Sequence, residues 1–291
     1  MQNNIKNITF VGLIVNLILA AVKSGVGYFC KSQALFADGI HSLSDMATDL
    51  IILIGANFWK KPADDCHPYG HARIETLITI IIGSALGVTA LFIGWDAIVS
   101  FGQKNNKNPG WSVFIVALIS IFVKEILFRW TIFNGKKLKS SALVSNAWHH
   151  RSDALSSIPV VVAVLGGYFF PNLKFLDQTA ALLVAAMLFK AAWSIAKPGF
   201  YEICEASAGE ETELLLKKLA EKIPEIKEIH AVRTRRLGGT VFADLHLLVD
   251  PKISVEEGHN IGKQFKKLVL DSNSEIVDVL VHIEPFNEKI D

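Results

Sequence analysis

Long apolar runs fill the first two-thirds of the chain and constrain its fold more than any other feature. Each run has about the 20 residues that a helix needs to cross a lipid bilayer, and short polar links separate the runs. The six runs cover residues 8–29, 35–58, 75–101, 111–134, 142–169 and 175–197. We therefore predict six membrane-spanning helices within a first domain, residues 1–199.

Residues 200–291 have the composition of a soluble domain, rich in lysine and glutamate. Apolar periodicity of 3.6 or 2 residues assigns its elements. Helices are predicted over 210–224 and 254–271, and strands over 228–238, 239–250 and 275–285. Ser254, with Glu257 three residues later, is expected to cap the second helix. The order α-β-β-α-β predicts a small open sheet with helices on one face.

The links between the apolar runs carry an uneven share of basic residues. An even number of spans places both termini on one side, and the positive-inside rule identifies that side as the cytoplasm. The basic residues on the side of the termini are Lys60, Lys61, Arg73, Lys136, Lys137, Lys139 and Lys197. We expect an integral protein of the cell's inner (plasma) membrane with cytoplasmic termini.

Composition also excludes some classes of function. The net charge is +1, and no basic patch with interleaved aromatic residues occurs, so we expect no nucleic-acid partner. The three cysteines lie far apart without a CxxC motif, which argues against a disulfide framework.

Two histidine–aspartate pairs interrupt the apolar runs. His149 and Asp153 lie in the segment NAWHHRSDALSS, and His41 and Asp45 lie in ADGIHSLSDMATD. A charge at mid-bilayer costs roughly 2.5–3.5 kcal/mol, so such residues usually face a partner, a cavity or an ion. Each pair is four residues apart and shares one helix face. Two imidazoles and two carboxylates match a tetrahedral zinc-like site, although the same residues also serve to hydrogen-bond a helix bundle together.

Further acidic residues, Asp38 and Asp49, continue the same face of the second predicted helix. They indicate a hydrophilic stripe along an aqueous path. In the fourth helix we expect Lys124, Glu125 and Arg129 to form an internal ion pair with snorkelling ends.

The segments ADGIHSLSD, HPYGHARIE and NAWHHRSDALSS resemble the cation diffusion facilitator family of divalent-metal transporters, and the resemblance covers nearly the whole chain. It implies that His41, Asp45, His149 and Asp153 form the transport site. It also implies a ferredoxin-like cytoplasmic tail, a homodimer, and exchange of metal for protons. Bacterial relatives often carry a carboxylate at the position of His41, which widens their selectivity towards cadmium. The histidine here therefore makes cadmium a less expected cargo.

The link after the second helix holds a further cluster. The resemblance assigns Asp64, His67 and His71 to a second metal site, whereas the alternative interpretation is a solvated polar loop. It also implies a salt bridge between the two domains, from Arg73 to Glu205.

Histidines recur along the predicted strands and helices of the tail. A histidine on a strand is usually a surface residue, but together these match the family's binuclear site at the tail dimer interface. The implied ligands are His230, His246, His259, His282 and Glu284. The family often has aspartate where Glu284 stands.

These observations predict proton-coupled efflux of divalent cations from the cytoplasm by a homodimer. Two imidazoles and two carboxylates suit zinc, and also iron(II) or cobalt. The alternative is a membrane-anchored metal sensor or assembly scaffold of the same family without transport. An enzyme is not expected, because no HExxH motif occurs and four protein ligands leave no position for a catalytic water. No cofactor beyond the bound divalent metal is expected, and the partners are metal ions, protons, the bilayer and a second copy of the chain.

Overall fold

The computed structural model describes residues 2–59, 61–101, 110–138, 141–170, 173 and 175–286. Within these ranges the side chains of residues 2–7, 47–57, 59, 141, 142 and 145 are not described.

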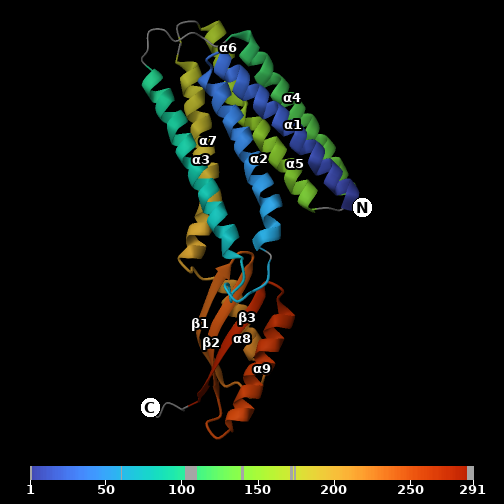
Figure 1. Ribbon diagram of the computed structural model, residues 1–291, viewed down its shortest axis with the longest axis vertical. Helices are drawn as coiled ribbons and strands as arrows, with labels where there is room; N and C mark the ends of the chain where they lie inside the picture. Colours follow the sequence, from blue (N-terminus) through green and yellow to red (C-terminus); the bar gives the residue numbers. More distant parts are fainter. Residues whose placement is uncertain are drawn as a thin grey trace. The chain divides into compact units, whose positions relative to one another are not determined.

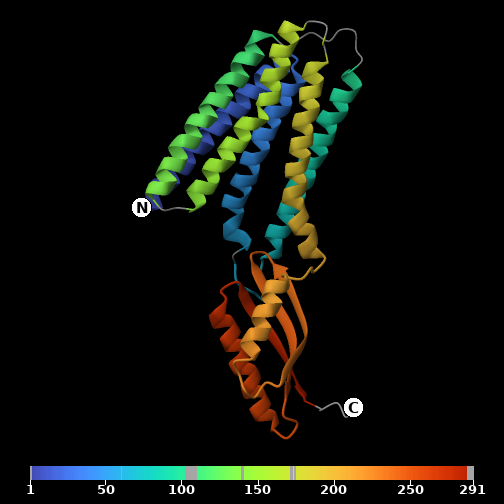
Figure 2. The same cartoon turned by 180° about the vertical axis from the view of Figure 1, so that it is seen from behind.

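Helices fill the first two-thirds of the described chain. They are α1 (Gln2–Phe29), α2 (Gln33–Trp59), α3 (Arg73–Ser100), α4 (Trp111–Lys137), α5 (Ser141–Ser156), α6 (Ile158–Phe169) and α7 (Leu176–Ile203). Figures 1 and 2 both show α4 running beside α1 and α5. The pair α3 and α7 approaches closely where Gly83 faces Ala196, because a side chain at Gly83 would overlap that alanine.

The chain divides into two compact units. One contains Met1–Ile54 and Ile81–Ala196, and the other contains Gly55–Ile80 and Lys197–Asp291. The first unit holds most of the helical bundle, and the second joins the ends of α2, α3 and α7 to the tail. The domain boundary at residue 199 stays a prediction.

Five segments of the described chain are long and apolar enough to cross a membrane. They are Ile8–Phe29, Arg73–Ser100, Trp111–Lys137, Asn146–Phe169 and Leu176–Ile203. They coincide with five of the predicted spans. The remaining predicted span falls on α2, where many side chains lie outside the described residues. Together with the tail described below, these segments confirm the predicted class of a helical membrane region followed by a small α+β domain.

The fifth predicted span, 142–169, is retained as a span over Asn146–Phe169 but is divided into two helices. Helix α5 ends at Ser156, and α6 begins at Ile158 with Pro159 in its first turn. Proline has no backbone N–H to donate and its ring crowds the carbonyl four residues before it, which breaks the helical ladder. The break leaves Ser156 and Ser157 together at the junction, where both hydroxyls are buried.

The tail has the predicted order of elements. It comprises α8 (Glu210–Ala220), β1 (Glu228–Leu237), β2 (Thr240–Val249), α9 (Val255–Ser272) and β3 (Ile276–Pro285). Strand β2 is central, antiparallel to β1 and parallel to β3. Gly238 turns the β1–β2 hairpin with a φ of +60°, a conformation that glycine adopts without strain. The capping box of Ser254 and Glu257 is present at the start of α9.

The two faces of the tail sheet differ. Alternate residues of β2, such as Leu245 and Leu247, are buried in a core with Leu216 of α8 and Phe265 of α9. Figure 2 shows α8 and α9 on the same face of the sheet. His246 lies between the buried leucines and therefore points to the opposite face, which neither α8 nor α9 covers and which we call the uncovered face.

Candidate metal sites

Three of the four predicted transport ligands converge inside the helical bundle. We call His41, Asp45 and Asp153 the buried group, because one donor atom from each lies within 4.8 Å of the others. His41 Nε2 lies 3.8 Å from Asp45 Oδ2 on the same helix, α2, and Asp153 comes from α5. His41 and Asp153 are only 8% and 4% exposed. An imidazole and two carboxylates at this spacing are suitable ligands for a divalent cation.

His149 stands beside the buried group and is not part of it. Its Nε2 lies 3.8 Å from Asp153 Oδ1, and its side chain is 45% exposed. The ring belongs to the preceding turn of α5, and its distance from Asp153 is that of a neighbour four residues away on the same helix.

A network of buried ions lies next to the buried group. Lys23 and Lys124 are both fully buried. Lys23 Nζ lies 2.8 Å from Asp38 Oδ2, and Lys124 Nζ lies 3.2 Å from Asp153 Oδ2. Both ammonium groups donate to Ser42 Oγ, at 3.3 and 3.4 Å. Each buried lysine is thus paired with a carboxylate, as desolvated charges must be.

Asp38 does not line an aqueous path, which corrects that prediction. Besides its contact with Lys23, it accepts hydrogen bonds from Ser156 Oγ at 2.7 Å and Ser157 Oγ at 2.6 Å. Its side chain is fully buried and its oxygens are satisfied. Asp49, the other predicted member of the stripe, lies outside the described side chains.

Of the ion pairing predicted within the fourth helix, the part that involves Arg129 is confirmed and the part that involves Lys124 is wrong. Glu125 accepts from Arg129 Nε at 2.9 Å, as expected for residues four apart on a helix. Lys124 instead contacts Asp153, because adjacent residues on a helix point in different directions. The sequence signal for both buried lysines was a lysine within an apolar run, which requires a partner, although the pattern does not identify that partner.

The link between α2 and α3 gathers the predicted second cluster. We call Asp64, His67 and His71 the link group; Asp64 lies 3.3 Å from His67 Nδ1 and 3.4 Å from His71 Nε2. The backbone N–H of His67 donates to Asp64 and is the main cause that holds the pKa of this carboxyl below its usual value. The carboxylate therefore stays charged and able to bind a cation in mildly acidic solution.

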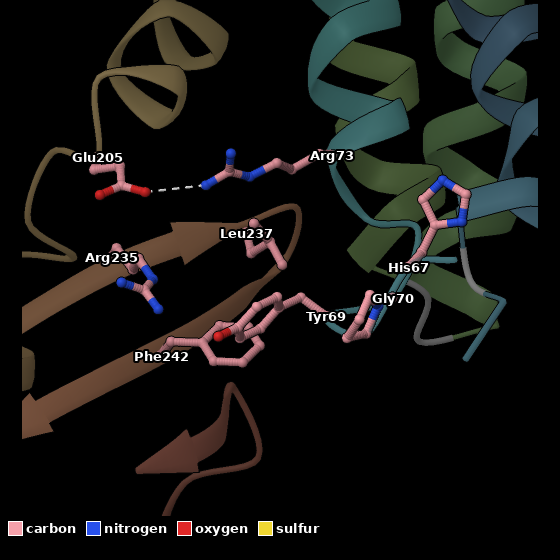
Figure 3. Close-up of a pocket in the computed structure, with 9 residues that line it drawn as sticks. His67, Tyr69, Gly70, Arg73, Glu205, Arg235, Leu237 and Phe242 are labelled. Carbon is pink, nitrogen blue, oxygen red and sulfur yellow. Dashed lines mark hydrogen bonds and ion pairs between the residues drawn. The ribbon is translucent and has the colours of Figure 1, made fainter. Parts of the chain in front are cut away.

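Arg73 and Glu205 meet within the second unit. Arg73 Nη2 lies 3.1 Å from Glu205 Oε1, and the two side chains are 60% and 55% exposed. Figure 3 shows the pair at a cleft of about 400 Å³, with Tyr69 against Phe242 on the other side. Exposed pairs contribute little to stability, so the role of this pair as an interdomain salt bridge stays a prediction.

Glu202, which the sequence did not single out, makes a second connection in this region. Its Oε1 accepts the backbone N–H of Gly238 at 2.7 Å and also the hydroxyl of Thr76. The β1–β2 turn is therefore hydrogen-bonded to the end of α7, and through it to α3. No sequence motif predicts this contact, because it depends on how the β1–β2 turn packs against the end of α7.

Three histidines form a row across the tail sheet. His230 pairs with His246 in the antiparallel register, and His246 pairs with His282 in the parallel one. Glu284 lies among them, 2.9 Å from His230 Nε2, 2.8 Å from His246 Nδ1 and 3.5 Å from His282 Nε2. We call His230, His246 and Glu284 the tail group, since their donor atoms lie within 4.8 Å of one another.

The tail group favours an ionised Glu284. The hydrogen bond with His230, and then the neighbouring imidazoles, hold the pKa of Glu284 below its usual value. His282 stands at the edge of this group, with its side chain 64% exposed. His259 lies on α9, is exposed, and is not brought into the group. Helix α9 packs on the face of the sheet that carries Leu245 and Leu247, opposite to the row of histidines.

Comparison with known families agrees with this arrangement. The profile described as "Cation efflux transmembrane domain" matches residues 9–204, and the one described as "Cation efflux protein, cytoplasmic domain" matches residues 208–286. These two matches identify a membrane transporter of metal cations. The chain belongs to the cation diffusion facilitator family, whose members carry out metal efflux.

Individual relatives match along almost their whole length. An uncharacterised transporter of Methanocaldococcus jannaschii is 35% identical over 275 residues, covering 94% of this chain and 95% of that protein. The manganese efflux system protein MneP of Bacillus subtilis is 32% identical over 291 residues, covering 98% and 97%. A solved C-terminal domain of a MamM variant covers 27% of this chain and 98% of its own, at 26% identity and a TM-score of 0.26.

Proposed function

We propose that this chain exports divalent cations from the cytoplasm, zinc before the others, in exchange for protons and as a homodimer. The observation that carries the proposal is the buried group, with His149 one helical turn away. Closing that ring onto a bound cation completes two imidazoles and two carboxylates. This donor set suits tetrahedral zinc, and iron(II) or cobalt after it.

Proton exchange follows from the chemistry of these ligands. Carboxylate and imidazole must be deprotonated to bind metal, so metal binding releases protons and metal release takes them up. Histidines as a class titrate near pH 6.5, within reach of physiological pH. A site that opens alternately to the two sides of the membrane therefore couples metal export to proton entry.

The uncovered face of the tail sheet supports the proposal of a homodimer. Every second residue of β3 points to this face, and these residues include Leu280, His282 and Glu284. Leu280 is 67% exposed, an apolar side chain beside a row of metal-binding groups. A second tail laid on this face buries Leu280 and brings two tail groups together. Metal held there then draws the tails together and biases the membrane helices, which is how we propose that cytoplasmic metal regulates transport.

The placement in the cell extends the same proposal. The excess of basic residues in the links on the side of the termini supports cytoplasmic termini in an inner (plasma) membrane. The link group and the tail group then both face cytoplasmic metal.

Manganese export is a second candidate. The relative MneP is named for manganese efflux, and the match covers 97% of its length. In the buried group two carboxylates accompany one imidazole, and oxygen-rich sets suit manganese. The alternative of a sensor or scaffold without transport is disfavoured because the sequence keeps all four transport ligands, which a scaffold does not need.

Everted membrane vesicles that contain the full chain test these alternatives. Zinc, manganese, iron(II) and cobalt are offered separately, and metal uptake is measured with and without an imposed proton gradient. We expect gradient-dependent uptake with zinc fastest. A preference for manganese would favour the second candidate, and metal binding without uptake of any ion would favour a sensor.

A further inference from the structure

Lys124 occupies an oxygen that a transported cation also needs. Its ammonium is fully buried and lies 3.2 Å from Asp153 Oδ2, and Asp153 belongs to the buried group. Lys23 is equally buried and also donates to Ser42, but its carboxylate is Asp38, which lies outside that group. The fold thus provides two similar buried lysines, of which Lys124 alone contacts a proposed metal ligand among the described residues.

The other two members of the buried group, His41 and Asp45, are not paired with a lysine among the described residues. Within the described part of the chain, His41 Nδ1 and Asp45 Oδ2 are buried and without a hydrogen-bond partner. An arriving cation therefore finds on α2 an imidazole and a carboxylate that lie 3.8 Å apart and, among the described residues, hold no ammonium. On the α5 side it finds a carboxylate that already holds an ammonium.

Like charges repel strongly in a medium of low dielectric constant. A divalent cation and an ammonium cannot both lie close to Asp153 without a large energetic cost. The lysine side chain is a single positive charge on a flexible four-carbon stem, so it can move away. Ser42 Oγ, 3.4 Å from Lys124 Nζ, already provides an acceptor on α2 for the displaced ammonium.

We propose that Lys124 is a tethered counter-cation that sets the metal affinity of the transport site. It neutralises Asp153 when the site is empty, and it leaves that carboxylate when a divalent cation binds. Binding is thereby weakened and release is made faster, which a transporter needs in order to turn over. This inference rests on the proposed function of the buried group.

The first test compares variants of the full chain in detergent. Zinc affinity is measured by calorimetry for the wild type, Lys124→Met, Lys124→Arg and Lys23→Met. We expect Lys124→Met to bind zinc about tenfold more tightly, within the usual range of coupling between two binding events. Its transport in proteoliposomes should be slower, because release becomes limiting. Lys124→Arg keeps the charge and should bind as the wild type does, and Lys23→Met, the matched control, should not bind more tightly.

The possible outcomes separate this inference from the proposed function. If the wild type binds zinc and Lys124→Met binds it equally or more weakly, Lys124 does not compete with metal and the inference is overturned. If Lys23→Met gains as much affinity as Lys124→Met, the effect is general charge removal, which also overturns it. If the wild type binds neither zinc nor manganese, the proposed function fails and takes the inference with it.

A second measurement needs no variant and stands even if Lys124→Met does not fold. Structures of the wild-type chain are determined with a chelator and with zinc. We expect the Lys124 ammonium to lie beyond the ion-pair distance of about 4 Å from Asp153 when zinc is bound. An ammonium that stays within that distance in the zinc-bound structure contradicts the proposal.

Discussion

The buried group and the tail group use the same side-chain chemistry in opposite surroundings. In the buried group the carboxylate of Asp153 is closed off from solvent and paired with the fully buried Lys124. In the tail group Glu284 lies on an uncovered sheet face and is held by histidines. A buried charge requires an internal counter-charge, whereas an exposed one is stabilised by water. The same kinds of ligand, imidazole and carboxylate, can therefore have their metal binding controlled by a lysine in the buried group and by solution pH in the tail group.

The comparison assigns different tasks to the two groups. In the buried group, metal that binds Asp153 displaces Lys124. Because these charges are buried, removing either one leaves the other unpaired and destabilises that region. The tail group already gathers its ligands around one carboxylate, and it can equilibrate with the metal and proton concentrations of its surroundings. We therefore expect substitutions in the buried group to stop transport, and substitutions in the tail group to alter its regulation by metal.

The largest effect is expected from Asp153→Ala. Transport should be abolished because a metal ligand is lost, and unfolding should become easier by about 3 kcal/mol because Lys124 is left buried and unpaired. The double variant Asp153→Ala/Lys124→Met should recover most of the stability and none of the transport. Chemical denaturation and vesicle uptake measure the two properties. Equal stability of the single and double variants would contradict the ion pair.

The next effect concerns the tail alone. Residues 206–291 contain their own apolar core and should fold as a fragment. Zinc at about a hundredfold above its dissociation constant should add about 2.7 kcal/mol of stability, a rise in melting temperature on the order of 10 °C. His246→Ala with His282→Ala should remove this rise. His259→Ala, the matched control on α9, should keep it. A melting curve indifferent to zinc would leave the tail as a dimerisation module.

The pH dependence of that zinc effect distinguishes its ligands. Because the pKa of Glu284 is lowered in the folded tail, its carboxylate stays charged as the pH falls through the usual range of glutamate. The stabilisation by zinc should therefore disappear earlier than the charge on Glu284, because protons compete with zinc for the imidazole ligands. Glu284→Gln should reduce the size of the zinc effect, because one ligand of the tail group is lost. Melting curves measured across pH, with and without zinc, check this; loss only in strongly acidic solution would point to the carboxylate instead.

A smaller effect is expected on metal choice. His41→Asp replaces a nitrogen ligand of the buried group with an oxygen and adds a negative charge, so it should shift the preference towards cadmium severalfold. Competition between zinc and cadmium during uptake measures this shift. An unchanged ratio would show that His41 does not set selectivity.

Features with a local cause could be predicted from the sequence. The pairs of residues four apart, the order of elements in the tail and the capping box of Ser254 all follow from periodicity or from side chains close in sequence. The break before α6 was also visible in Pro159, although the apolar run outweighed it.

Features that depend on how helices pack could not be predicted. The partners of Lys23 and Lys124 lie on other helices, and no spacing within one helix reveals them. His149 lies outside the buried group with its side chain 45% exposed, although its spacing from Asp153 is the one that the sequence gives. The spacing within one helix does not determine which side chains of two helices meet. Glu202 was missed because it contacts the backbone of the β1–β2 turn, where no side-chain motif exists.

Proton movement driven by a zinc gradient shows whether this chain exchanges zinc for protons through the buried group. The wild type, Asp153→Ala and His246→Ala/His282→Ala are reconstituted in proteoliposomes that contain a pH-sensitive dye. We predict a zinc-dependent proton signal from the wild type and from the tail variant, and no signal from Asp153→Ala. A signal at the wild-type rate from Asp153→Ala, or zinc transport without any proton signal in the wild type, would contradict the account.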